Sequence, residues 1–214
     1  GNDATARTLT LTNANTYTGA TTIRGGTLQL RDSGSISSTA GLTAYYGTLL
    51  WDNFGLNPIG NPNPTRVAAA NPVTLQGGTL TFQAAGSSDT TSTLNSITMT
   101  GGQNTINTLP FINEGSTVKL TIGNLIRNTA THSGVNFNGF TTNNSGGSNT
   151  LGGQGLTTNS NIIINQLNGT AFSASNLVNN LIGGWAVADG STFATYSNTF
   201  GVVAMGNTYG GFAA

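Results

Sequence analysis

The carboxylates are the first residues to test for chemistry, because hydrolysis of a glycosidic bond needs two carboxyl groups a few ångströms apart. Asp32 and Asp52 are about 20 residues apart and each follows an apolar run, so a repeat of that length can stack them at one corner. We favour solvated turn carboxylates over a catalytic pair, and we expect no enzymatic activity. No two acidic residues are neighbours in sequence; they are Asp3, Asp32, Asp52, Asp89, Glu114 and Asp189.

The other reactive residue types also lack partners. His132 is the single histidine and lies in a polar stretch, whereas a nucleophilic triad needs a histidine placed beside both a Ser and an Asp, so we expect it to be an exposed loop residue. The chain has no cysteine, so it offers neither disulfides nor a Cys-based metal site. Lys119 and Glu114 can support an isopeptide crosslink, but solvated charges are the simpler interpretation. Gly152–Gly155 precedes no helix and lacks the lysine of a phosphate loop, so we expect no cofactor and no metal.

The elements that must position these residues are short β-strands. In Leu9–Leu30, apolar residues alternate with polar ones between turn-forming Asn and Gly residues, which predicts strand, turn, strand. A Gly-Thr-Leu pattern then recurs, and its glycines Gly26, Gly47, Gly78 and Gly102 are spaced by about 21, 31 and 24 residues. Such a period is typical of a solenoid, in which each coil contacts only its neighbours.

Alternation along these runs predicts both the strands and the core. The predicted strands are Thr8–Thr12, Ala20–Ile23, Thr27–Leu30, Gly41–Tyr45, Gly47–Trp51, Val73–Gln76, Thr79–Gln83, Ser96–Thr100, Thr105–Leu109, Thr117–Ile122, Gly123–Asn128 and Asn161–Leu167, with a hairpin of Trp185–Val187 and Phe193–Tyr196 around Asp189-Gly190. The inward positions are predicted to be Leu9, Leu11, Ile23, Leu28, Leu30, Leu49, Leu75, Leu80, Phe82, Ile97, Met99, Ile106, Leu120, Ile122, Ile162, Ile164 and Leu167.

Composition excludes several classes of protein. Only 6% of the 214 residues are charged and the formal net charge is zero, so the chain lacks the basic stripe of a nucleic-acid-binding protein. No run of 18 apolar residues exists, so we expect no membrane insertion. The 36% hydrophobic content is arranged in strand-like runs, which argues against disorder. Stacked Asn and Thr side chains suit a parallel coil.

The stretch TLTLTNANTYTGATTIRGGTLQL resembles the autotransporter-associated β-strand repeat of bacterial passenger domains. Thr8–Thr12, Asn15–Gly19, Ile23 and Gly26–Leu30 fit that pattern, which covers about a tenth of the chain. The apolar run Ile182–Tyr196 is also similar to segments of large repeat proteins of this kind. The resemblance implies a right-handed parallel β-helix that is exported and displayed outside the cell or on its surface, with no enzymatic activity of its own.

Residues 52–72 break the repeat and hold four of the five prolines, so they are predicted to leave the solenoid as a side loop. Because loops on a rigid scaffold carry recognition, its candidate interaction residues are Asp52, Phe54, Pro58, Pro62, Pro64 and Arg66. Aromatic residues near the loop can bind sugar rings. The simpler interpretation, which we favour, is that Tyr45 and Trp51 point inward and fill the coil.

The two ends of the chain are predicted to be assembly surfaces, because an open stack leaves backbone groups unpaired and the sequence offers no charged or helical cap. The candidate residues are Thr8, Leu9, Leu11, Phe200, Val202, Val203, Tyr209 and Phe212. The expected partner is a second copy joined head to tail, or a neighbouring repeat of a longer chain, since a first residue other than Met suggests an excised or processed piece.

We therefore expect a single all-β domain over residues 1–214, a right-handed parallel β-helix of about seven to nine coils, with an apolar end segment at 181–214. The expected function is structural: a building block of an extracellular filament, stalk or surface layer. The alternatives are a carbohydrate-binding surface adhesin that uses the 52–72 loop, and a degenerate polysaccharide-active enzyme.

Overall fold

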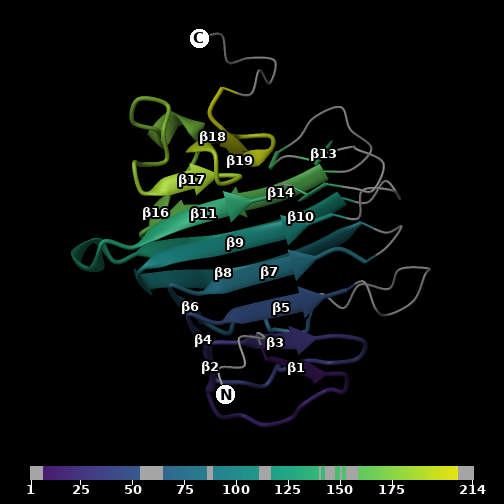
Figure 1. The fold of residues 1–214 in the computed structure, drawn as a ribbon. Helices are drawn as coiled ribbons and strands as arrows, with labels where there is room; N and C mark the ends of the chain where they lie inside the picture. Colours follow the sequence, from purple (N-terminus) through teal and green to yellow (C-terminus); the bar gives the residue numbers. More distant parts are fainter. Residues whose placement is uncertain are drawn as a thin grey trace, which may run out of the picture.

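The computed structural model describes residues 7–53, 65–85, 89–110, 117–139, 141–142, 148–149, 151–152 and 159–206. Two facing β-sheets are stacked along the chain, and successive strands alternate between them (Figure 1). This is the predicted all-β solenoid, and most of its strand pairs are parallel. The number of coils and their handedness stay predictions.

The nine-stranded sheet collects the strands that follow the glycine turns. In spatial order its members are β1 (Thr8–Leu11), β3 (Thr27–Leu30), β5 (Thr48–Asp52), β7 (Thr79–Gln83), β9 (Gln103–Leu109), β11 (Gly134–Asn138), β17 (Ala186–Ala188), β18 (Thr192–Ser197) and β19 (Gly201–Ala204).

The eight-stranded sheet collects the strands that precede those turns. Its members are β2 (Thr21–Arg24), β4 (Leu42–Tyr45), β6 (Val73–Gln76), β8 (Thr90–Gly101), β10 (Thr117–Arg127), β14 (Asn159–Ile164), β15 (Gln166–Leu167) and β16 (Thr170–Ala171). Short elements lie outside both sheets: a hairpin of β12 (Thr141–Thr142) and β13 (Ser148–Asn149), and the 3-10 helices η3 (Thr129–Thr131) and η4 (Ala174–Asn176).

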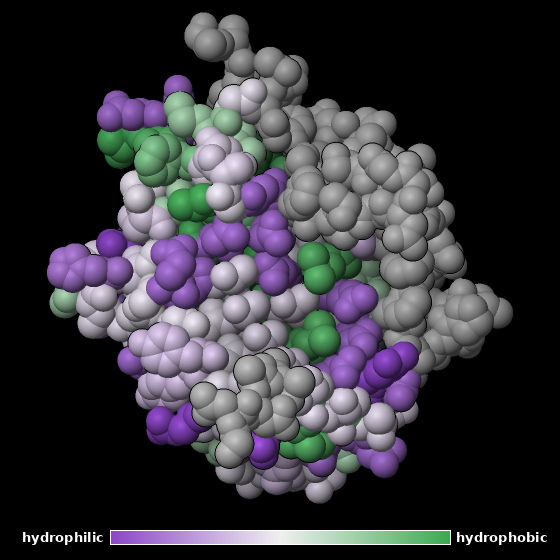
Figure 2. Space-filling model, in the orientation of Figure 1, coloured by the Kyte–Doolittle hydropathy of each residue, from purple (hydrophilic) through white to green (hydrophobic). Residues whose placement is uncertain are grey.

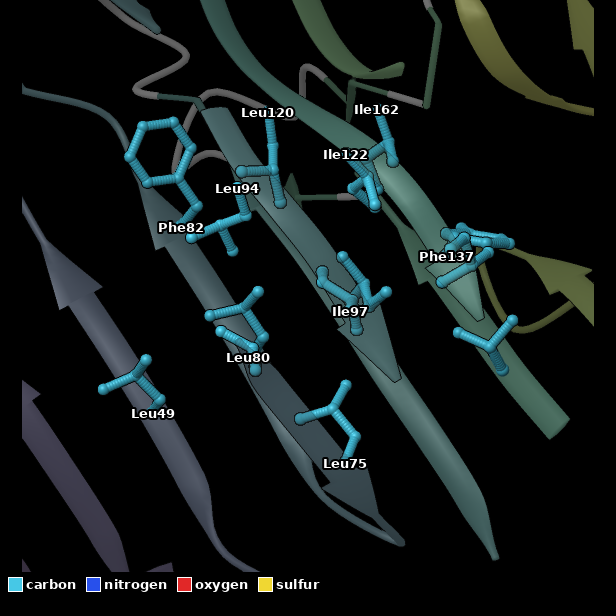
Figure 3. Packing of buried hydrophobic residues seen from close by; sticks show 14 of the residues in the cluster. Leu49, Leu75, Leu80, Phe82, Leu94, Ile97, Leu120, Ile122, Phe137 and Ile162 are labelled. Atoms are coloured by element: carbon cyan, nitrogen blue, oxygen red, sulfur yellow. The ribbon is translucent and has the colours of Figure 1, made fainter. Parts of the chain in front are cut away.

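Identical positions of successive coils lie in register, which builds the core as columns of apolar side chains. Leu9, Leu28, Leu49, Leu80 and Ile106 form one such column. Figure 3 shows leucines, isoleucines and phenylalanines of the two sheets meeting in the space between them. The column is buried from Leu28 onward, so parallel stacking removes the inward face of each strand from water.

The outward face of the nine-stranded sheet carries a threonine ladder. Thr8, Thr27, Thr48, Thr79 and Thr105 are paired in register along five consecutive strands. β-branched side chains pack well against identical neighbours on a pleated surface. Figure 2 shows this side of the molecule as mostly pale and purple with scattered green, which agrees with a polar outer face over an apolar interior.

One inward assignment, that of Tyr45, is wrong, and Leu9 is inward but not buried. Leu9 lies on the inward face but is 62% exposed, because no described strand lies beyond β1 to cover it. Tyr45 points outward and is half-buried, since its neighbours Leu42 and Ala44 take the inward positions of β4. Trp51 does point inward, is fully buried, and contacts Phe82 with ring centroids 4.9 Å apart.

The parallel arrangement ends before the last strands. β17, β18 and β19 form an antiparallel series, and β16 pairs antiparallel with β15. The reversal between β17 and β18 is made at Asp189-Gly190, where both residues have a left-handed backbone with φ of 51° and 65°. The predicted turn is therefore present. It carries the chain back across the end of the stack and does not start another parallel coil.

Candidate functional site

The N-terminal end of the solenoid is an open, mostly apolar hollow of about 820 Å³, which we call the N-terminal mouth. Its apolar lining includes Leu9, Leu11, Ile23 and Leu28, the inward side chains of β1, β2 and β3. Further lining residues are polar or cationic: Arg7, Thr8, Asn15, Tyr17, Thr21, Thr22, Arg24 and Thr27. The exposed Leu9 therefore belongs to a core that is uncovered on one side.

The backbone edges of β1 and β2 border this mouth. Thr27 N–H donates to the Arg7 carbonyl at 2.8 Å, and Arg31 N–H donates to the Leu11 carbonyl at 3.0 Å. Because backbone groups alternate in direction along a parallel strand, those of Thr8 and Thr10 point away from β3. No described strand pairs with that side of β1, nor with the corresponding side of β2. Thr8, Leu9 and Leu11, which the sequence indicates as candidate assembly residues, lie on this edge, and their role in assembly stays a prediction.

At the C-terminal end of the described stack the interior is covered, although β19 and β16 are the outermost described strands of their sheets. Val202 and Val203 of β19 are 0% and 1% exposed, so the prediction that these side chains form an assembly surface is wrong. They are buried because β19 folds back against β18 and lies close to β14. Phe200 is only partly exposed, and its carbonyl accepts a hydrogen bond from Asn161 Nδ2 at 3.0 Å. Tyr209 and Phe212 lie outside the described residues.

A buried tyrosine, Tyr196, joins β18 to β14 at this end. Tyr196 Oη donates to the Ile164 carbonyl at 2.9 Å and accepts from Ile164 N–H at 3.1 Å. The Tyr196 ring also meets Phe172, with centroids 5.0 Å apart. Burial raises the pKa of Tyr196 above its ordinary value of 10.0, and the hydrogen bond to Ile164 opposes the shift to a smaller extent. No pattern in the sequence predicted this contact, which joins residues 32 positions apart.

The base of the 52–72 segment belongs to the solenoid. Asp52 pairs with Gln83 in the ladder and is 4% exposed, and Arg66 is 0% exposed, so their assignment to a projecting loop is wrong. Arg66 donates from Nε to Asn53 Oδ1 at 3.0 Å and from a terminal nitrogen to the Gly34 carbonyl at 2.7 Å. Phe54, Pro58, Pro62 and Pro64 lie outside the described residues.

Burial also changes the proton affinity of this arginine. Desolvation lowers the pKa of Arg66 from its ordinary value to about 10, while the negative charges of Asp52 and Asp32 oppose the shift. Arg66 therefore stays cationic at neutral pH inside the fold. It is a structural cation that ties the base of the segment to the preceding coil.

Asp32 and Asp52 do meet at one corner. Arg31 Nε lies 3.9 Å from a carboxylate oxygen of each. Asp52 Oδ2 also accepts a hydrogen bond from Gln29 Nε2 at 2.7 Å. The Arg31 guanidinium is therefore close to both carboxylates, and Asp52 is buried. The three side chains form an ion cluster at the corner of the coil.

The remaining candidates lie apart from one another. His132 is exposed directly after η3, with a left-handed φ of 51°. Lys119 is an exposed residue of β10, and Glu114 lies outside the described residues. Within the described ranges, no group of three or more His, Cys, Asp or Glu side chains is placed to hold a metal ion. In the same ranges, the structure contains no helix long and apolar enough to span a membrane.

Comparison with known families identifies the same stretch that frames the N-terminal mouth. Residues 6–30 match the model of the Passenger-associated-transport-repeat, as the resemblance implied. A passenger repeat of this kind indicates an exported surface protein of the autotransporter passenger type. Neither the curated proteins nor the solved structures include a significant match to the chain.

Proposed function

We propose that this chain is a stiff structural section of an exported, passenger-type surface protein, and that its N-terminal end takes a further β-coil by parallel strand addition. The observation that carries the proposal is the N-terminal mouth, where apolar core side chains and the edges of β1 and β2 are uncovered. An uncovered edge is a template for another strand. The exported location is supported by the passenger repeat at residues 6–30.

Register and side-chain chemistry support a coil of the same kind as the occupant. Leu9 and Leu11 continue the columns that Leu28 and Leu30 begin, so an added strand with leucines two residues apart completes the core. The burial of Leu9, now 62% exposed, then provides part of the free energy of association.

The occupant is either a preceding coil of a longer chain or a second copy of this one. A preceding coil would pair with β1 in parallel. Two copies instead meet through their N-terminal ends with their β1 strands antiparallel, as a two-fold axis requires, because β18 and β19 cover the other end of the described stack. A contact between identical surfaces closes as a dimer, whereas a head-to-tail contact continues as a filament. For two copies of this chain we therefore propose a dimer, in place of the filament expected from sequence. This role requires no cofactor and no catalytic site.

The test is to extend the chain. A second copy of the Thr8–Gly26 segment, which is one coil in the register that pairs Thr8 with Thr27, is placed immediately before Thr8, and thermal unfolding is compared with that of the parent. Because the stability of a solenoid is roughly a sum of coil and interface terms, the extended chain should melt several degrees higher, and Leu9 should become protected.

The matched control is the same extension in a Thr10→Pro variant. Proline at this position removes the outward N–H that would donate to the added strand, and leaves the carbonyls bonded to β3 in place. The gain in melting temperature should then be lost. An extended chain that melts like the parent, with rapid hydrogen exchange throughout the added segment, would contradict the proposal.

A further inference from the structure

Tyr46 occupies a turn position that glycine fills on the neighbouring coils. Its φ is 48°, and Gly25, Gly77 and Gly102 at the corresponding turns have φ of 64°, 62° and 67°. A left-handed backbone is strained for a bulky residue. Tyr46 is 73% exposed, so burial of its own ring does not offset that strain. Strain combined with exposure points to a side chain retained for a contact outside the fold.

The Tyr46 ring is held against the next coil. A Cβ atom on Gly77 would lie 2.6 Å from Tyr46 Cε1 and 2.7 Å from Cδ1, so only glycine lets the ring approach the backbone this closely. The ring is therefore an exposed platform whose position is fixed by the coil beneath it.

Two aromatic–guanidinium pairs lie along the same edge of the solenoid. The Arg24 guanidinium is 4.7 Å from the Tyr45 ring centroid, and that of Arg127 is 5.2 Å from the Trp185 ring. Arg24, Tyr45 and Arg127 end strands of the eight-stranded sheet, and Trp185 directly precedes a strand of the nine-stranded sheet. This is the edge from which β5, β7 and β9 start in Figure 1. We call it the basic edge, comprising Arg7, Arg24, Tyr45, Tyr46, Arg127 and Trp185.

The four acidic residues that the structure describes lie on the opposite edge. Asp32 follows β3, Asp52 ends β5, Asp89 precedes β8 and Asp189 follows β17. Three of these carboxylates bind groups of the fold: Asp52 accepts from Gln29, Asp89 from Thr117 N–H at 2.8 Å, and Asp189 from Gly139 N–H at 2.9 Å. No described carboxylate side chain lies on the basic edge.

The chain is therefore neutral overall but electrically two-sided. Arg7, Arg24 and Arg127 give one edge a positive potential that no carboxylate of the described residues cancels. Arg24 and Arg127 rest on aromatic rings, which hold the guanidinium groups in place without neutralising them.

We propose that the basic edge binds an acidic polysaccharide, with sugar rings stacked on Tyr46 and uronate carboxylates paired with Arg24 and Arg127. Guanidinium groups bind carboxylates through two parallel hydrogen bonds, and aromatic rings provide the apolar faces against which sugar rings pack. The basic edge shares Arg7 and Arg24 with the lining of the N-terminal mouth, whereas Tyr46, Arg127 and Trp185 lie outside that lining.

The spacing of the charges favours a polysaccharide over a nucleic acid. Arg24 and Arg127 end β2 and β10, and the uncharged ends of β4, β6 and β8 lie between them. Duplex DNA carries about one charge per 1.7 Å and is bound by dense basic clusters. A polyuronate, with its carboxylates set apart by sugar rings, matches sparse arginines alternating with aromatic residues.

The test is affinity electrophoresis of the whole chain in gels containing polygalacturonate, with neutral dextran and duplex DNA as comparison probes. Polygalacturonate should retard the chain, and dextran and DNA should not. An Arg24→Gln, Arg127→Gln double variant should bind at least tenfold more weakly. Tyr46→Gly should weaken binding severalfold without lowering the melting temperature, because glycine suits this turn.

Arg31→Gln is the control for charge alone, since Arg31 lies on the opposite edge. It should bind polygalacturonate like the parent. The proposal is overturned by absence of retardation in polygalacturonate, by equal weakening in Arg31→Gln and the double variant, or by equally strong retardation in DNA. Normal binding by Tyr46→Gly would overturn the role of its ring.

Discussion

The two ends of this solenoid differ in whether the apolar interior is covered. At the N-terminal end β1 and β2 leave their outer edges without a described partner, and Leu9 is 62% exposed. At the other end β18 and β19 reverse direction, and Val202 is 0% exposed. A parallel stack reproduces its own open edge with every coil, so it ends only where the chain departs from the repeat.

The comparison indicates that the interior is covered by strands that reverse direction, and that charged residues are not needed for this. β18 and β19 contain no charged residue, yet they cover the interior because they run antiparallel across it. Tyr196 then joins the reversed strands to β14 through its two hydrogen bonds with Ile164. The N-terminal end has no corresponding reversal among the described residues, which is why we propose that it takes a further coil.

The largest expected effect comes from placing the same charge at each end. Val202→Asp buries an unpaired carboxylate and should lower the free energy of unfolding by about 3 kcal/mol or more. Leu9→Asp places it at an exposed position and should change stability by no more than about 0.5 kcal/mol. Urea unfolding of both variants measures this, and equal losses would remove the distinction between the ends.

A smaller effect is expected from the tyrosine that fastens the closed end. Tyr196→Phe removes the hydroxyl that bonds both backbone groups of Ile164, and should cost about 1–3 kcal/mol. Tyr17→Phe at the open end is the matched control: its hydroxyl, 2.9 Å from Thr21 Oγ1, is exposed, and its removal should have little effect. Similar losses in the two variants would count against a special role for Tyr196.

The same tyrosine predicts a pH dependence. Its folded pKa is raised above the ordinary 10.0, so folding favours the neutral phenol. That contribution is fully present below pH 10 and is lost as the pH rises from there through the folded pKa. The unfolding free energy of the parent should therefore fall more steeply above pH 10 than that of Tyr196→Phe. Parallel profiles for the two proteins would refute this linkage.

The smallest expected effect is a gain in stability. Tyr46→Gly relieves a left-handed backbone at an exposed turn near the open end and should stabilise the fold by about 1 kcal/mol. Gly77→Ala at the next turn is the contrasting variant, since it adds a Cβ against the Tyr46 ring and should destabilise. Thermal unfolding distinguishes them, and a lower melting temperature for Tyr46→Gly would show that its strain is offset by contacts.

The regular part of the fold was predictable because each coil repeats one alternating pattern. The predicted strands Thr27–Leu30, Val73–Gln76 and Thr79–Gln83 coincide with β3, β6 and β7. The pattern is strong there because short turns bound every strand and the inward residues are leucine, valine or phenylalanine. β11 and β19 were missed, since β11 is rich in asparagine and β19 lies in an uninterrupted apolar run.

The site residues were less predictable, because their roles depend on contacts between coils. Proline density marked the 52–72 segment as a loop, but could not show that Arg66 returns to donate to Gly34, 32 positions away. The sequence around Val202 could be recognised as apolar, but not as buried. Val202 is buried because β19 turns back to pair antiparallel with β18. Leu9 was placed on the correct face, but its exposure follows from the absence of a described strand beyond β1.

The most direct test of the difference between the ends is native-state hydrogen exchange of single amides in dilute solution. The Thr10 amide, on the outer edge of β1, should exchange nearly as fast as an unstructured peptide. The amides of Ile164 and Met205, which donate to Tyr196 Oη at 3.1 Å and to the Phe193 carbonyl at 2.9 Å, should be strongly protected. A Thr10 amide as protected as that of Ile164, or rapid exchange at Ile164 and Met205, would contradict the account of one open and one closed end.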